Sequence, residues 1–124
     1  MGRISNTNIN KITPKQVICI RNILRDLGLS TSLKGTTLLN KAIQIVIINN
    51  NEFIVLEEVY ESISHSYKDM NSVQIRMAIK YALDNRNENK SKKNFERIFG
   101  FEYDEFYFTN KTIVEEIVRI ILTK

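Results

Sequence analysis

The chain has little of what metal sites and many enzymes need. Its 124 residues include one cysteine, one histidine, four glycines, one proline and no tryptophan. A single cysteine excludes an intrachain disulfide and a cysteine zinc cluster, and a single histidine excludes a multi-histidine metal site. So few glycines argue against turn-rich β architecture and against a glycine-rich phosphate loop. We therefore expect no cofactor, no metal and no enzyme activity, and favour a binding module.

Long hydrophobic runs are also missing. The sequence has no stretch of about 18 apolar residues, the length that a transmembrane helix needs, and no secretory signal pattern. About 43% of the residues are apolar and 26% are charged, as in ordinary globular domains. We expect a cytoplasmic protein of one domain that does not bind membranes.

Charge is present in alternating blocks. Residues 1–41 hold seven Lys/Arg and one acidic residue, whereas residues 42–65 hold four Glu and no Lys/Arg. Residues 66–97 hold eight basic and four acidic residues, and residues 98–124 hold three basic and five acidic residues. Alternating basic and acidic segments are typical of a protein with one basic face, as nucleic-acid binding requires. Charges that are simply solvated are the alternative interpretation.

Apolar residues recur at spacings of three and four, which predicts an all-α fold. Pro14 begins the first helix and Gly28 follows its end. A strand over residues 43–48 is the local alternative because that run is β-branched, but its lead-in has helical spacing. The expected six helices cover residues 14–27, 36–48, 52–66, 71–84, 94–99 and 110–122.

Other segments lack this periodicity. Residues 1–13 are polar and predict a flexible arm or linker ahead of the domain at 14–124. Residues 85–93 are rich in Asn and Lys and predict a mobile loop. Residues 101–108 are aromatic and acidic, and we expect an irregular segment whose rings pack onto the core.

Two of the expected helices, 52–66 and 71–84, are joined by a short connection at residues 67–70. The outward face of the second helix is polar and basic near its beginning. This is the pattern of a helix-turn-helix, whose second helix enters the major groove of DNA. Plain helical bundles contain such pairs too, so the pattern alone leaves both alternatives open.

Several sequence strings match one known family. The chain resembles the C-terminal DNA-binding effector domain of the stage-zero sporulation master regulator, sporulation protein A. The strings that carry the resemblance are IRNILRDLG at 20–28, LKG at 33–35 with Leu39, AI at 42–43, the helix at 55–67, AIKYAL at 78–83, FERIFGF at 95–101 and TN at 109–110. Together they span about residues 14–122.

The resemblance implies a six-helix domain containing a helix-turn-helix that regulates sporulation genes in bacteria. It implies binding to a promoter box in double-stranded DNA, often as tandem copies with self-association on DNA, and contact with the sigma factor of RNA polymerase. The parent response regulator carries a receiver domain, which we expect to be absent from this chain.

The recognition helix departs from the family pattern. The family has an acidic residue and arginine where this chain has Arg76 and Met77, and Ser-Arg where it has Val73 and Gln74. Methionine cannot bind guanine through two hydrogen bonds as arginine does. The resemblance therefore implies the family's fold for this chain, but not the DNA sequence that the family recognises. We expect base contacts from Gln74, Arg76 and Met77.

Contacts to the DNA backbone position a protein without reading sequence. The expected backbone contacts are Lys34, Lys68, Ser72, Lys80 and Tyr81.

Two functions therefore compete: a sequence-specific DNA-binding regulator, and a helical interaction module that keeps the fold but binds RNA polymerase or a partner regulator. The outward face of helix 71–84 discriminates between them. A positive surface shared with Lys34 favours DNA, whereas an apolar patch of Val73, Met77 and Tyr81 favours a protein partner.

Overall fold

The computed structural model describes residues 12–49 and 55–123, and across these residues it contains only helices. This confirms the predicted all-α, six-helix class, and the strand alternative for residues 43–48 is wrong. The elements are α1 (Pro14–Asp26), α2 (Lys34–Ile48), α3 (Leu56–Ser64), α4 (Ser72–Asp84), α5 (Glu88–Phe99), the 3-10 turn η1 (Glu105–Tyr107) and α6 (Asn110–Leu122).

The ends of α1 follow from local chemistry. The Thr13 hydroxyl accepts a hydrogen bond from the Gln16 N–H at 3.0 Å, and the Gln16 side chain accepts one from the Thr13 N–H at 2.9 Å. These two bonds satisfy two of the backbone donors that a helix start leaves free. At the other end, Gly28 has φ 97°, a left-handed conformation that stops the helix.

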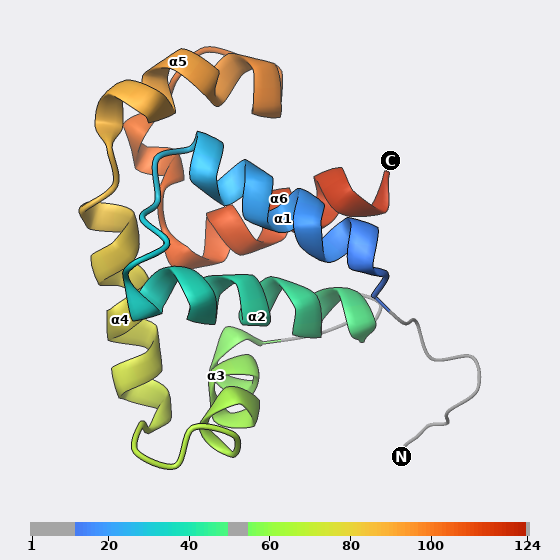
Figure 1. Ribbon diagram of the computed structural model, residues 1–124, viewed down its shortest axis with the longest axis vertical. Helices are drawn as coiled ribbons and strands as arrows, with labels where there is room; N and C mark the ends of the chain where they lie inside the picture. Colours follow the sequence, from blue (N-terminus) through green and yellow to red (C-terminus); the bar gives the residue numbers. More distant parts are fainter. Residues whose placement is uncertain (1–11, 50–54, 124) are drawn as a thin grey trace.

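Helix α2 is the centre of the core. It packs against α1, α3, α4 and α6, and Figure 1 shows α1 and α3 on opposite sides of it with α4 crossing its N-terminal end. Because neighbours surround it, apolar residues cover most of its circumference. Its buried residues are Gly35, Thr36, Leu38, Leu39, Ala42, Ile43, Val46 and Ile47.

The predicted loop at 85–93 is wrong, because α5 already begins at Glu88 rather than at 94. The Asn87 side chain accepts a hydrogen bond from the Lys90 N–H at 3.2 Å and caps the helix. Polar residues dominate this helix, and its only fully buried stripe is Ser91, Phe95 and Phe99. That stripe is too narrow to be recognised by periodicity. The basic residues at 90–93 therefore lie on a helix that the sequence did not predict.

The helix-turn-helix boundaries also differ from expectation. Helix α3 begins at Leu56; the expected start at residues 52–54 lies outside the described residues, as does nearly all of the expected arm at 1–13. It ends at Ser64, whose hydroxyl donates to the Glu61 carbonyl oxygen at 2.6 Å. The connection to α4 therefore spans residues 65–71 rather than 67–70.

The aromatic segment after α5 packs around Phe95, which is fully buried. Its ring lies 5.4 Å from those of Tyr103 and Tyr107, edge to face. The expectation that all rings pack onto the core is wrong for Phe106, which is 82% exposed. Phe106 lies within η1, a short turn none of whose three residues is fully buried.

Candidate nucleic-acid interface

Helix α4 begins with a complete capping box. The Asn71 side chain accepts a hydrogen bond from the Gln74 N–H at 2.8 Å, and the Gln74 side chain accepts one from the Asn71 N–H at 2.9 Å. This fixes the first turn of the helix, the part that meets base edges in a helix-turn-helix. The capping box also uses the side-chain oxygen of Gln74, so the Gln74 amide NH₂ is the group that remains to donate to a base.

The outward face of α4 is centred on apolar side chains. Val73, Met77 and Tyr81 are 55%, 53% and 59% exposed. They follow one another at a spacing of four residues, so they form one stripe along the helix. The structure thus places the apolar patch that favours a protein partner on the very face expected to bind DNA.

The two polar residues expected at base edges flank this stripe. At about 100° per residue, Gln74 and Arg76 lie about 160° apart around the helix, with Met77 between them. Both are exposed. The structure therefore does not bring Gln74 and Arg76 together as one positive surface.

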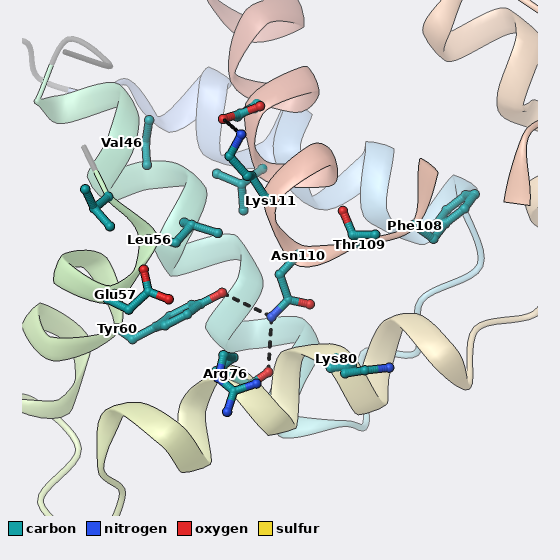
Figure 2. A pocket seen from close by; sticks show the side chains of 13 residues that line it. Val46, Leu56, Glu57, Tyr60, Arg76, Lys80, Phe108, Thr109, Asn110 and Lys111 are labelled. Atoms are coloured by element: carbon teal, nitrogen blue, oxygen red, sulfur yellow. Dashed lines mark hydrogen bonds and ion pairs between the residues drawn. The ribbon is translucent and has the colours of Figure 1, made fainter. Parts of the chain in front are cut away.

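Arg76 lies beside a groove of about 500 Å³ between α2, α3, α4 and α6 (Figure 2). The Asn110 side-chain amide donates to the Tyr60 hydroxyl and to the Arg76 carbonyl oxygen, each at 3.1 Å. Burial raises the pKa of Tyr60, so its hydroxyl stays protonated. Asn110 is the first residue of α6, so its two hydrogen bonds link α6 to both α3 and α4.

Lys80 also lines this groove, and its ammonium pairs with Asp84 at 2.7 Å. Both side chains are more than half exposed. An exposed pair four residues apart on a helix contributes only about 0.3–0.5 kcal/mol. A DNA phosphate can therefore replace Asp84 as the partner of Lys80.

The remaining expected backbone contacts lie around α4. Lys34 is the exposed first residue of α2, and Lys68 is exposed in the connection at 65–71. Ser72 is the half-buried first residue of α4. Tyr81 stays exposed rather than covered by the segment at 85–93. These positions lie on α4, in the connection before it, or at the start of α2, which packs against α4.

Sequence reasoning missed the polar support of this site. The hydrogen bond between Tyr60 and Asn110 joins two helices, α3 and α6, that are far apart in the chain. The residues lie in separate strings, at 55–67 and at 109–110, and nothing in either string pairs one with the other. Within the described ranges there is no cluster of three His, Cys, Asp or Glu side chains that could hold a metal, nor any helix long and apolar enough to span a membrane.

Comparison with known proteins identifies the fold family. The family model described as "Sporulation initiation factor Spo0A C terminal" matches residues 20–121. Searches of curated proteins and of solved structures each returned no match. The matched region contains the helix-turn-helix, the core helix α2 and α6. Because the model covers most of the 124 residues, the chain belongs to the family of Spo0A C-terminal domains, the DNA-binding effector domains of the sporulation regulator.

Proposed function

We propose that this chain is a transcriptional regulator that reads a specific site in double-stranded DNA by inserting α4 into the major groove. The single observation that carries the proposal is the face of α4. This face is exposed along the length of the helix, and the helix begins at a capping box. The chain that carries it belongs to a DNA-binding family. A helix presented in this way fits the width of the major groove.

The composition of the exposed face indicates which bases it reads. Val73 and Met77 have no hydrogen-bonding groups, so they suit the C5-methyl groups of thymine. Gln74, on one flank, can donate its amide NH₂ to a base acceptor, and Arg76 on the other flank can bind guanine or a phosphate. The target is therefore expected to contain thymines opposite the centre of α4.

Phosphate contacts would hold the helix in this register. We assign them to the set predicted from the sequence: Lys34, Lys68, Ser72, Lys80 and Tyr81. Ionic contacts of this kind make affinity fall with salt, without favouring one sequence.

The experiment is a selection of bound duplexes from a random pool, followed by replacement of each selected thymine with deoxyuridine. Uracil pairs as thymine does but lacks the methyl group. Loss of affinity at one or two central positions supports methyl reading by Val73 and Met77. The same replacement outside the bound site is the control. No enrichment of any sequence would end the groove-reading proposal.

A second function is favoured by the same apolar stripe. Val73, Met77 and Tyr81 would also suit a protein partner, such as RNA polymerase or another regulator. This alternative predicts no salt-dependent DNA affinity, and loss of partner binding when a charge enters the stripe.

The DNA-binding proposal has four further parts. We propose that the domain extends over residues 14–124 and that the protein is cytoplasmic. We also propose that it contacts the sigma factor and self-associates on tandem boxes.

A further inference from the structure

We propose that a second cleft, between α1 and α2, binds a phosphate group. The cleft has a volume of about 530 Å³ and lies apart from the groove beside α4. Its polar lining includes Arg21 and Arg25 from α1, Lys41 from α2, and the hydroxyl-bearing residues Thr31, Thr36 and Thr37. None of the residues that line this cleft belongs to α4.

The charge of the cleft has one sign. Arg21 and Arg25 lie four residues apart on one face of α1, and Lys41 faces them from α2. No acidic side chain of the described residues lines the cleft. Like charges at this spacing destabilise a helix, so their grouping favours an anion that neutralises them.

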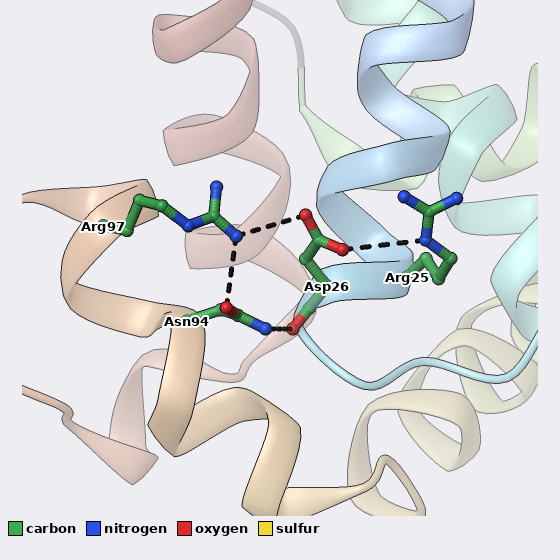
Figure 3. A network of polar contacts seen from close by, with 4 residues as sticks. All are labelled: Arg25, Asp26, Asn94 and Arg97. Carbon is green, nitrogen blue, oxygen red and sulfur yellow. Dashed lines mark hydrogen bonds and ion pairs between the residues drawn. The ribbon is translucent and has the colours of Figure 1, made fainter.

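Asp26 neutralises this cluster only in part, although it forms an ion pair with Arg25 (Figure 3). The Nε atom of Arg25 lies 3.6 Å from an oxygen of Asp26, too far for a hydrogen bond. The other oxygen of Asp26 accepts from Arg97 of α5 at 3.2 Å, and Arg97 also donates to Asn94 (Figure 3). One carboxylate, Asp26, is therefore shared between Arg25 and Arg97, so the cluster of Arg21, Arg25 and Lys41 keeps a net positive charge.

Thr36 supplies an independent observation. Its side chain is only 7% exposed, and its Oγ1 atom has no hydrogen-bond partner among the described residues. Buried hydroxyls are nearly always hydrogen-bonded. Because Thr36 lines the cleft, rotation about its Cα–Cβ bond would allow the hydroxyl to donate to an anion there.

The N-terminus of α2 adds to this attraction. Thr36 and Thr37 lie in its first turn, and its N-cap residue, Leu33, makes no side-chain capping hydrogen bond. The positive end of the helix dipole favours an anion at this position, although the Thr36 N–H itself already donates to the Leu33 carbonyl oxygen at 3.1 Å. A phosphate group carries more negative charge and more acceptor oxygens than a carboxylate, so it is the better match for two guanidinium groups and an ammonium.

The phosphate can come from two sources, a free phosphate ion or the backbone of bound DNA. An NMR titration of the full chain with sodium phosphate, against sodium chloride at equal ionic strength, tests the free ion. We expect saturable shifts of the Thr36 and Thr37 amides with phosphate only. Replacing both arginines (R21Q with R25Q) should weaken this binding roughly tenfold or more, because charged hydrogen bonds are lost.

The matched control is K90Q with K93Q, which removes the same charge from exposed positions of α5. Thr36→Val tests the hydroxyl without changing charge, and should weaken phosphate binding while leaving the fold intact. Circular dichroism on each variant separates unfolding from lost binding.

A second arm uses duplex DNA at two salt concentrations. If the site holds a backbone phosphate, the double arginine variant lowers the slope of log affinity against log salt by about 0.9 per lost contact, and the lysine control does not. If it holds a free ion, both variants bind DNA equally. Unsaturable shifts with phosphate, together with equal DNA slopes in both double variants, would overturn the proposal.

Discussion

Gly35 lies against the Ala78 backbone with no room for a side chain: a Cβ atom at Gly35 would lie 1.9 Å from the Ala78 carbonyl oxygen. This contact brings the N-terminus of α2 directly onto the middle of α4 (Figure 1). The position of α4 relative to the core therefore depends on one residue that lacks a side chain.

Gly35→Ala should lower the free energy of unfolding by about 1–3 kcal/mol, because the backbones must separate. It should also weaken DNA binding, since α4 shifts. Urea denaturation and a DNA titration measure the two effects. Gly100→Ala is the control: no atom lies within 4 Å of a Cβ there, and only its φ of 90° opposes the change. Normal DNA affinity in Gly35→Ala would contradict the role of this contact.

Ile43→Asp should destabilise the protein by several kcal/mol. Ile43 is fully buried in α2, so the new carboxylate would be desolvated without a partner. Thermal unfolding followed by circular dichroism measures the loss. Ile43→Val, which removes a single methylene, should lower stability by only about 0.5–1.5 kcal/mol. A folded Ile43→Asp protein of normal stability would mean that α2 is not the centre of the core.

Substitution of Arg76 and of Lys34 should separate base reading from phosphate binding. Arg76→Ala should weaken binding to the selected site by about 1–3 kcal/mol and relax preference at one base pair. Lys34→Ala should weaken binding to all sequences alike and reduce the salt slope by about one unit. Titrations against selected and scrambled duplexes at two salt concentrations measure both. Equal, uniformly weak binding by every protein would contradict groove reading.

Met77→Arg replaces the centre of the apolar stripe with the arginine that the resemblance leads us to expect there. Because arginine binds O6 and N7 of guanine, preference should shift toward guanine at the facing position. Repeating the selection with the variant measures this shift. If the stripe instead binds a protein partner, the variant should lose that partner, and neither protein should enrich any DNA sequence in the selection.

The stability of the protein should fall as pH rises from 10.0 to about 12. Burial and the neighbouring Glu116 carboxylate raise the pKa of Tyr107 from 10.0 to about 12. In that interval the unfolded chain loses the phenol proton and the folded chain keeps it, so rising pH favours unfolding. Urea denaturation at several pH values measures the decline. Tyr107→Phe should make it shallower.

Local patterns predicted the helices that have a wide apolar stripe along their whole length. Helix α4 begins within one residue of its expected start because Asn71 caps it through hydrogen bonds with Gln74, three residues further along the chain. Helix α5 was underestimated because its first half is polar and its buried stripe includes Ser91. Ser91 is buried because its hydroxyl donates to the Leu27 carbonyl oxygen, a partner 64 residues away.

The helical class, the central position of α2 and the candidate recognition helix could all be predicted from the sequence, because periodicity and capping act over a few residues. The surroundings of each side chain depend instead on tertiary packing. That packing joined Asn110 to Tyr60 and gathered Arg21, Arg25 and Lys41 around one cleft. Those arrangements depend on how helices cross, and that is set by the packing of the whole core rather than by neighbouring residues.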